Sequence, residues 1–556
     1  MCQVTRLFRD SFVAVLRRPF AYIHLCRRHA MHKTPSAQHA AALLLAAVLA
    51  MSAPVCADAQ STAPTAHTQS RSHDADATHD GVGPRTDPPF RASRKQSART
   101  AATIPGASAL TVATDWPTFG MNNQRIGYNP LETVLGVGNV SQMRAHWSTD
   151  IGGPISTQPT LATGILINDV PTDVVYAATW LGRTVALDAA TGAIIWSVQA
   201  PTVQTDCSDF DASNGLLGTI GTPALDRATN RLYMVTADGF LHALDLSTGA
   251  DLMQPVQLMD PENTPPRTFV YGGPTLDGTD IYLTTASRCD LRPYHGQVIR
   301  VSTTSGEILQ RWYPTGATGP DGGGIWGPGG VSITPRGASV YTATGNSFSE
   351  PENLPYGEHV VKLTRSLEVQ AANSPAPPSG NDVDFGATPL LFQTNSCPPM
   401  LAAIQKGGML YIYNRNTLES GPTNSFSLGR GGFNGIPAFD PNLNQIYVST
   451  GLVTNGLVAL SVRSDCSVAI AWNLLVSGSS ISPSIPPVAA NDVVYYVSGV
   501  ASEVVAVDAR SGQLLWSTNQ LPDADRVTGG IFASPTVVNG QLFVAGFDHK
   551  IHAYGL

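Results

Sequence analysis

The chain has 556 residues, of which 42% are hydrophobic and 13% charged, and its formal net charge is −8 at pH 7. This length and apolar content allow a large hydrophobic core, and the low charge content leaves a surface rich in Ser, Thr, Asn and Gly. An acidic chain with few basic residues excludes nucleic acid and anionic membranes as expected partners.

Residues 1–59 have the pattern of an export signal. Met31 begins a short basic stretch, an apolar run follows over residues 40–51, and residues 56–59 resemble a cleavage site with small side chains. The apolar run is too short to cross a bilayer, so no membrane span is expected. Met31 is also a candidate for the true start of the protein. We therefore expect a periplasmic or secreted protein.

Residues 60–113 differ in composition from the rest of the chain. They are rich in Ser, Thr, Ala, His, Asp and Pro and show no apolar periodicity, which predicts a disordered linker. Removing residues 1–59 takes away seven of the 33 basic and two of the 41 acidic residues, which leaves a formal charge of −13. The folded domain is expected to cover residues 114–556.

This domain is built from a repeated motif. The pattern AxDxxTGxxxW is intact at Ala186–Trp196. Imperfect copies occupy residues 243–249, 301–312 and 506–516, and weaker copies occupy 413–417 and 459–472. A short apolar run precedes nearly every copy, so each unit is expected to contain strands separated by an Asp-xx-Ser/Thr-Gly turn. The Asp can accept hydrogen bonds from backbone amides of the turn, and the Gly supplies the positive φ.

The repeat predicts an all-β propeller. A period of roughly 45 to 60 residues with about four strands fits a propeller blade and not an α-solenoid. The turn positions are Asp188, Asp245, Ser302, Leu363, Asn414, Ser461 and Asp508, with a half-copy at residues 553–555. That half-copy lacks its Trp, and Trp147 stands before the first full copy. We therefore expect about eight four-stranded blades, closed by N- and C-terminal strands, with seven as the alternative count.

Four cysteines follow the export signal: Cys207, Cys289, Cys397 and Cys466. An even number in an oxidising compartment predicts two disulfides, for which three pairings are open. We favour Cys207 with Cys289 and Cys397 with Cys466, because each pair would join neighbouring blades. Four buried free thiols are the alternative.

The motif AxDxxTGxxxW is similar to the repeat of propellers that include the pyrroloquinoline quinone (PQQ) dependent dehydrogenases, and the resemblance covers residues 115–556. Residues 115–120 and 127–130 also resemble the first segment of those enzymes. The same repeat occurs in propellers that bind no quinone, such as the outer-membrane assembly scaffold of Gram-negative bacteria. The fold alone therefore does not decide the activity.

Four segments resemble the quinoprotein site, in the family's order along the chain. The resemblance implies that Trp326 is the aromatic platform beneath the quinone. It implies that Asn346, in Thr-Gly-Asn, gives a side-chain oxygen to calcium. It further implies that Asp384 binds calcium and takes the substrate hydroxyl proton, and that Lys406 contacts the quinone. Each residue also has a structural interpretation: a packing Trp, a turn Asn, a turn Asp and a solvated Lys.

The chain has no CxxCH for a covalent haem, so electrons would pass to an external acceptor. It departs from the family's alcohol dehydrogenases in two respects. It has no adjacent cysteines. The family's calcium-binding Glu is replaced by a segment in which Asp290 could supply the carboxylate. Asn346 and Asp384 alone would give calcium few protein oxygens.

These features predict an exported quinoprotein-like oxidoreductase that oxidises a small-molecule or polymeric alcohol with PQQ and calcium. The alternative is a non-catalytic envelope propeller that binds a protein or glycan as a scaffold. The quinone interpretation requires Trp326, Asn346, Asp384 and Lys406 to converge on one face. A separation above about 10 Å between Asn346 and Asp384 would exclude it, since they share one ion. The turn at residues 548–550 is expected to be a solvated loop.

Overall fold

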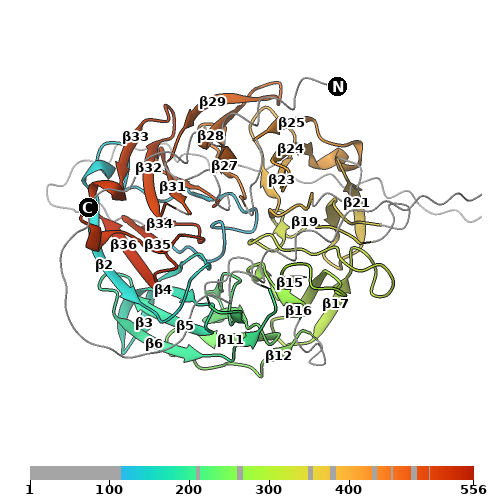
Figure 1. Ribbon diagram of the computed structural model, residues 1–556, viewed down its shortest axis with the longest axis horizontal. Helices are drawn as coiled ribbons and strands as arrows, with labels where there is room; N and C mark the ends of the chain where they lie inside the picture. Colours follow the sequence, from blue (N-terminus) through green and yellow to red (C-terminus); the bar gives the residue numbers. More distant parts are fainter. Residues whose placement is uncertain are drawn as a thin grey trace, which may run out of the picture. The chain divides into compact units, whose positions relative to one another are not determined.

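The computed structural model describes residues 114–556, apart from 208–212, 260–266, 349–354, 376–382, 429–434, 453–454, 477–484 and 500. The predicted export signal and linker, residues 1–59 and 60–113, lie outside the described residues. Eight antiparallel sheets are arranged around a ring in the order of the sequence (Figure 1). The predicted all-β propeller of eight blades is confirmed.

The first blade consists of β3 (Thr160–Ile167), β4 (Val170–Ala178), β5 (Arg183–Asp188) and β6 (Ile194–Gln199), and the second of β9 (Ala224–Asp226), β10 (Arg231–Val235), β11 (Phe240–Asp245) and β12 (Val256–Gln257). The third blade consists of β13 (Phe269–Val270), β14 (Thr275–Asp277), β15 (Asp280–Ala286), β16 (Gln297–Ser302) and β17 (Ile308–Trp312). The fourth blade consists of β18 (Ser332–Ile333), β19 (Val340–Ala343), β20 (Val360–Leu363) and β21 (Val369–Asn373). In the third blade, β13 and β14 both pair with β15. A small hairpin, β7 (Val203–Gln204) and β8 (Leu216–Leu217), follows the first blade.

The fifth blade consists of β22 (Leu390–Phe392), β23 (Met400–Gln405), β24 (Met409–Asn414) and β25 (Asn424–Ser427), and the sixth of β26 (Ala438–Asp440), β27 (Gln445–Leu452), β28 (Asn455–Val462) and β29 (Val468–Leu474). The seventh blade consists of β30 (Val488–Ala490), β31 (Val493–Ser498), β32 (Glu503–Asp508) and β33 (Leu514–Ser517), with β1 (Tyr128–Asn129) beside β30. The eighth blade consists of β34 (Thr536–Val538), β35 (Gln541–Ala545), β36 (Lys550–Gly555) and β2 (Arg144–Asp150).

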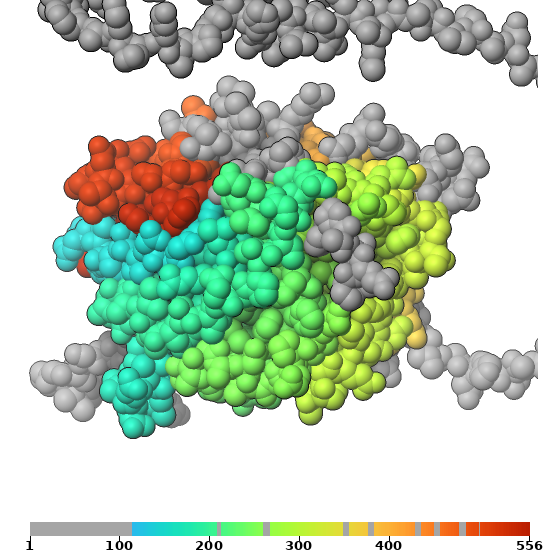
Figure 2. All heavy atoms as spheres, turned by 60° about the horizontal axis from the view of Figure 1, so that its bottom comes forward, coloured from blue at the N-terminus to red at the C-terminus, as the bar shows by residue number. Residues whose placement is uncertain are grey.

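The ring is closed by strands from both ends of the domain, as predicted. β2 pairs antiparallel with β36 and completes the eighth blade. The cyan residues that follow the start of the domain lie directly against the red C-terminal residues on the rim (Figure 2). Closing the ring in this way leaves the last blade with four strands, so seven blades are excluded.

Tryptophans of the outer strands join neighbouring blades. The indole Nε1 of Trp196 donates to the carbonyl oxygen of Leu246 in the next blade at 3.0 Å. A Cβ added to Gly249 would lie 2.7 Å from the Trp196 ring, so the turn must have Gly where the indole packs. Trp147, Trp472 and Trp516 donate in the same way, to Ala189, Ala509 and Met143 at 2.9–3.0 Å. We call these four contacts the tryptophan clamps.

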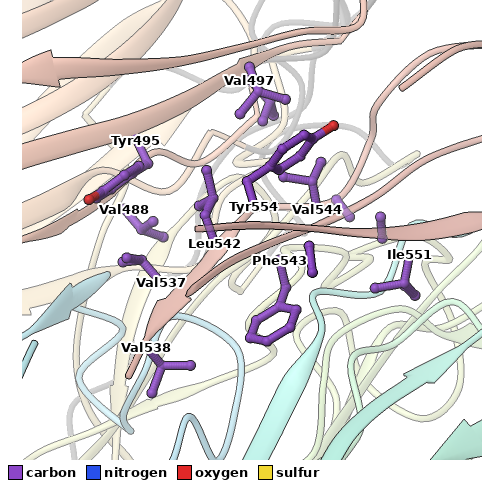
Figure 3. Packing of buried hydrophobic residues seen from close by; sticks show 14 of the residues in the cluster. Val488, Tyr495, Val497, Val537, Val538, Leu542, Phe543, Val544, Ile551 and Tyr554 are labelled. Carbon is purple, nitrogen blue, oxygen red and sulfur yellow. The ribbon is translucent and has the colours of Figure 1, made fainter. Parts of the chain in front are cut away.

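The core between blades consists of the apolar faces of successive sheets. Between the seventh and eighth blades, Val488 and Tyr495 lie beside Val537, Leu542 and other residues of the last sheet (Figure 3). All of these side chains are buried. Successive side chains of a strand point to opposite faces of the sheet, so every second residue of a strand contributes to the packing against one neighbouring blade.

The segment before β2 runs inside the ring, where it is drawn in blue (Figure 1). Its backbone and side chains contact the inner strands in the order of the blades: Trp116 with Leu161, Pro117 with Leu225, Asn123 with Leu276, Gln124 with Ile333 and Leu391, Ile126 with Phe439, Gly127 with Ala489, and Asn129 with Val537. One segment therefore links all eight blades around the axis.

Arg125 in this segment is fully buried. Its guanidinium donates to the carbonyl oxygens of Val331 and Phe119 at 3.2 and 2.8 Å, and to the hydroxyls of Thr118 and Thr275. Burial lowers its pKa to about 9. The hydrogen bonds to neutral oxygens satisfy the donors of this buried cation.

The two ends of the ring carry different connections. In each blade, successive strands are antiparallel and follow one another from the axis to the rim. The turn between the second and third strands and the link to the next blade therefore lie at the same end of the ring. We call this end the loop face. The other end, the turn face, carries the Asp-xx-Ser/Thr-Gly turns. In the described part of the chain, no helix has the length and apolar character to span a bilayer.

The two favoured disulfides are present, one on each face. Cys207–Cys289 lies on the loop face, and Cys397–Cys466 lies on the turn face, each with Cα atoms 5.6 Å apart. The first joins the link after the first blade to the third blade, and the second joins the fifth and sixth blades.

Candidate functional site

The predicted site residues all lie on the loop face. Trp326 is in the link between β17 and β18, and Asp384 is in the link between β21 and β22. Asn346 follows β19, and Lys406 follows β23. Links and second-to-third-strand turns of the third, fourth and fifth blades therefore supply these residues at one end of the ring.

Asn346 and Asp384 are in direct contact. The backbone amide of Asn346 donates to Oδ1 of Asp384, and its side-chain Nδ2 lies 3.2 Å from Oδ2. Asp384 is 5% and Asn346 9% exposed. The separation is far below the 10 Å limit, so the distance condition for a shared ion is met.

Lys406 and Trp326 complete the cluster. Nζ of Lys406 lies 3.6 Å from Oδ2 of Asp384 and 5.7 Å from the centre of the Trp326 ring. The Lys406 backbone amide also donates to the carbonyl oxygen of Asp384 at 2.7 Å. An ammonium group in this position stabilises the negative charge of the carboxylate and interacts with the indole face. The structure thus brings together all four residues, which are far apart in the sequence.

Two glycines allow the close packing of these side chains. A Cβ added to Gly345 would lie 2.1 Å from Oδ1 of Asp384, and one added to Gly386 would lie 2.3 Å from Cη2 of Trp326. Real Cβ atoms do not approach this closely. Gly345 therefore leaves room for the carboxylate, and Gly386 leaves room for the edge of the indole.

Asp290 lies on a neighbouring loop, between β15 and β16. Its Oδ1 accepts a hydrogen bond from the Tyr294 hydroxyl at 2.7 Å. Burial, and then the negative charges of Asp290 and Asp384, hold the pKa of Tyr294 well above its usual range. The phenol therefore stays protonated and donates to Asp290. This hydrogen bond ties Asp290 to Tyr294 within the same loop.

Backbone hydrogen bonds connect these segments side by side. Gly322 donates to the Tyr294 carbonyl at 2.8 Å, and Gly323 donates to the Asn346 carbonyl at 2.6 Å. Gly345 donates to Gly324 at 2.7 Å. The glycine-rich segment 322–324 therefore lies between the loop that carries Asp290 and the segment that carries Asn346.

The sequence did not single out Tyr294, Gly345 or Gly386 as parts of the site. A signal for Tyr294 was present, since residues 287–296 form a longer second-to-third-strand turn than residues 179–182 of the first blade and 406–408 of the fifth. The two glycines could not be assigned, because only the folded structure shows which side chains they approach.

The donor set fits a flat anionic cofactor with a hard cation beside it. Trp326 offers an aromatic surface and Lys406 a positive charge, while Asp384 and Asn346 offer oxygen atoms of the kind that calcium binds. Within the described ranges, no group of three or more His, Cys, Asp or Glu residues is placed to hold a metal. Calcium takes six to eight oxygens, so most of its ligands would come from other groups.

Two family models match parts of the chain. Residues 116–254 match the family described as "Glucose/ethanol/alcohol dehydrogenase, beta-propeller domain". Residues 431–555 match the family described as "Outer membrane protein assembly factor BamB".

Two curated relatives are alcohol-oxidising enzymes by name. The dehydrogenase subunit of alcohol dehydrogenase (quinone) from Gluconobacter oxydans is 30% identical over 135 residues, which cover 24% of this chain and 16% of the relative. Polyvinylalcohol dehydrogenase from Pseudomonas sp. is 22% identical over 500 residues, which cover 76% of this chain and 71% of the relative. The first match thus spans only a small part of that relative.

Solved structures share the fold. A europium-containing methanol dehydrogenase superposes with a TM-score of 0.60 at 15% identity, covering 80% of this chain and 98% of that structure. A quinohemoprotein alcohol dehydrogenase from Pseudomonas putida superposes with a TM-score of 0.61 at 15% identity, covering 80% of each chain. At this identity the likeness concerns the fold.

Together, the repeats, the eight-bladed ring and the matches define a PQQ-type β-propeller. The family models and the curated relatives support a PQQ β-propeller of the quinoprotein superfamily.

Proposed function

We propose that the protein is a quinoprotein-like oxidoreductase that oxidises an alcohol with PQQ and calcium and passes electrons to an external acceptor. The observation that carries the proposal is the contact of Asp384 with both Asn346 and Lys406, beside the indole of Trp326. A buried carboxylate, an amide and a cation next to an aromatic surface match what such a cofactor requires.

Each side chain has a defined role in this proposal. Trp326 stacks against the flat cofactor, and Lys406 binds its negatively charged groups. Asn346 and Asp384 give oxygen ligands to the cation. When bound, the quinone supplies a two-electron acceptor and calcium supplies a Lewis acid. Asp384 accepts the proton of the substrate hydroxyl, and the ammonium group of Lys406 lies 3.6 Å from that carboxylate.

Asp290 is proposed as a further calcium ligand in place of the family's Glu. Two observations support this role. Asp290 lies on the loop beside the glycine segment 322–324, and its negative charge and that of Asp384 both raise the pKa of Tyr294. Oδ1 of Asp290 accepts from the Tyr294 hydroxyl, and Oδ2 would be the oxygen that binds calcium.

The substrate is proposed to be an alcohol of small or polymeric form. The match to polyvinylalcohol dehydrogenase covers most of both chains and supports the polymeric class. Export to the periplasm or the medium is part of the proposal, supported by the sequence of residues 1–59 and by two disulfides, which persist in oxidising compartments.

The direct test is a titration of the purified protein with PQQ and calcium, followed by tryptophan fluorescence and absorbance. We expect saturable binding that is lost in Trp326→Ala and kept in Trp312→Ala, which removes a half-buried indole from the outer strand of the third blade. Saturable binding would justify a screen of alcohols with an artificial electron acceptor. Absence of binding at tens of micromolar cofactor would contradict the proposal.

A scaffold function is the second candidate. Its support is the match of residues 431–555 to the family of an outer-membrane assembly factor. In that case Trp326→Ala and Asp384→Asn would leave the protein's function intact, and capture of envelope proteins would not depend on calcium or quinone.

A further inference from the structure

A long loop on the third blade joins several distant parts of the loop face. We call residues 287–296, between β15 and β16, the strap. The corresponding connection in the first blade is residues 179–182, and in the fifth blade it is 406–408. The strap is therefore an addition to the repeat, located beside the candidate site.

The strap adopts a backbone conformation that its own residues disfavour. Cys289 and Asp290 have φ angles of 55° and 47°, in the left-handed region where residues other than glycine are strained. Two-residue hairpin turns such as Asn168–Asp169 share these angles, but the strap is a longer loop, in which contacts to other segments must hold this conformation.

Contacts to other blades fix the strap. Cys289 is bonded to Cys207, and the Arg288 guanidinium lies 4.8 Å from the centre of the Trp180 ring in the first blade. Arg292 makes a bidentate pair with Asp321 at 2.7 and 2.9 Å. The guanidinium of Arg292 also lies 4.4 Å from the centre of the Phe348 ring. Of these contacts, only the disulfide is covalent.

The far end of the strap is docked on the glycine segment of the site. Gly322 donates to the Tyr294 carbonyl, and Gly296 donates to the Gly322 carbonyl at 2.9 Å. A Cβ added to Gly296 would lie 1.9 Å from the carbonyl oxygen of Gly323, so the two backbones are in direct contact. Gly324 in turn bonds to Gly345, which packs against the Asp384 carboxylate.

We propose that the Cys207–Cys289 disulfide positions the candidate site through the strap. The disulfide holds the turn at Cys289 and Asp290, and the rest of the strap holds the glycine segment 322–324. That segment positions Asn346 and Asp384 through its hydrogen bonds to Asn346 and Gly345 and through the packing of Gly345 against Asp384. Cys207 and Cys289 are thus positioning residues that act through Tyr294 and Gly322. The identity of the ligand that the site binds rests on the proposed function, whereas the effect of the disulfide on this part of the loop face does not.

The test compares two matched double variants. Cys207→Ser with Cys289→Ser removes the disulfide of the strap, and Cys397→Ser with Cys466→Ser removes the one on the turn face. We expect amide hydrogen exchange of peptides covering 294–296 and 322–325 to become at least ~10-fold faster in the first variant only. Unchanged exchange in the first variant, or equal acceleration in both, would overturn the inference.

A second variant covers the case in which the first fails to fold. Asp321→Asn weakens the bidentate pair with Arg292 and leaves both disulfides intact. Exchange at 322–325 should then rise less than after loss of the disulfide, because the covalent link remains. If Asp321→Asn left this exchange at the wild-type rate, the strap would not hold the segment and the inference would be wrong.

Quinone titration of the same proteins separates this inference from the proposed function. If wild type binds PQQ with calcium, loss of Cys207–Cys289 should raise Kd by ~10-fold or more, since supporting groups typically affect metal affinity by that factor. Loss of Cys397–Cys466 should leave Kd unchanged even if the melting temperature falls. If wild type binds no quinone, the proposed function fails, and the exchange measurement still decides whether the disulfide positions this face.

Discussion

The two halves of the ring are held together differently. The blades near the closure, the first, sixth, seventh and eighth, are joined to the next blade by the tryptophan clamps of Trp147, Trp196, Trp472 and Trp516. In the third blade, Trp312 stands six residues after the turn glycine and not four, and it packs against Tyr356. The half that carries the candidate site thus departs from the repeat.

The disulfides border this irregular half. Cys207–Cys289 reaches the third blade, and Cys397–Cys466 connects the fifth blade to the sixth. Regular repeats with clamps form the scaffold, and the disulfides hold the part in which the loops differ from the repeat and carry the polar groups of the candidate site. The comparison implies that the clamps contribute mainly to stability, whereas one of the disulfides also determines the site.

The largest expected effect is the loss of a clamp. Trp516 is 1% exposed and donates to Met143 across the closure, so Trp516→Ala should lower the free energy of unfolding by about 3–5 kcal/mol. Trp312→Ala is the matched change in the other half, where the half-buried indole should cost less than about 2 kcal/mol. Denaturant unfolding measures both. Equal losses would show that the clamps are not what distinguishes the two halves.

Removal of the turn-face disulfide should come next. Cys397→Ser with Cys466→Ser should lower the free energy of unfolding by about 2–4 kcal/mol, because the unfolded chain gains freedom. The sequence separations of the two disulfides are 69 and 82, so loss of Cys207–Cys289 should cost a similar amount. Calorimetry of the two double variants checks this. A much larger loss for one of them would mean that native contacts, and not loop closure, dominate its contribution.

The regular half was the part that the sequence could predict. The Asp turns and the half-copy at residues 553–555 are local patterns, and they led to the correct number of blades and the correct closure. The favoured disulfide pairing is present, but only Cys397–Cys466 joins neighbouring blades, whereas Cys207–Cys289 joins the link after the first blade to the third blade. In the described structure, every predicted turn position lies at or next to the end of a third strand.

The sequence named candidate site residues but not their contacts. The resemblance to a known family named Trp326, Asn346, Asp384 and Lys406, but only the fold shows that they meet. Asp290 illustrates the limit, since its hydrogen bond to Tyr294 depends on a strap that no repeat predicts.

The expectation of a solvated loop at residues 548–550 was wrong for Asp548. Its side chain is 8% exposed and lies 2.9 Å from Nε2 of His552. Its carboxylate also accepts from the backbone amide of Thr528 at 3.1 Å. A turn of charged residues looks solvated in sequence, but here its neighbours on the loop face cover it.

The regular turns give a smaller, pH-dependent effect. Burial alone would raise the pKa of Asp245, but hydrogen bonds from Ser247, Thr248 and Asn230 outweigh it and lower the pKa. The contribution of Asp245 is therefore present above about pH 4 and is lost as pH falls through the lowered folded pKa. Asp245→Ala should cost about 1 kcal/mol at pH 7.

Unfolding measured from pH 7 to pH 2 tests this prediction. The difference between wild type and Asp245→Ala should shrink as the carboxyl group is protonated. Asp245→Asn keeps a hydrogen-bond acceptor in the turn but has no group that titrates. The difference in the free energy of unfolding between wild type and Asp245→Asn should therefore also become smaller as the pH falls. A difference from wild type that stays constant down to pH 2 would show that the carboxylate charge does not matter in this turn.

The smallest effect concerns the corresponding turn in the third blade, which ends β16 at Ser302. Ser302 accepts from the amides of Thr304 and Ser305 at 3.3 and 3.1 Å, whereas Asp245 accepts from the equivalent amides at 2.9 and 3.0 Å. An Asp at position 302 would bind these amides more strongly. It would also lie opposite Asp280, whose place in the second blade is taken by Arg231.

The two effects should nearly cancel in Ser302→Asp. Asp280 is 4% exposed and already pairs with Arg300 and Arg365, so a second carboxylate beside it meets like-charge repulsion. A double-mutant cycle of Ser302→Asp and Asp280→Asn should give an unfavourable coupling between the two carboxylates of about 0.5–1 kcal/mol. Ser302→Asp should then stabilise the Asp280→Asn background but not wild type. Equal stabilisation in both backgrounds would mean that repulsion from Asp280 is not the reason why this blade has Ser in the turn.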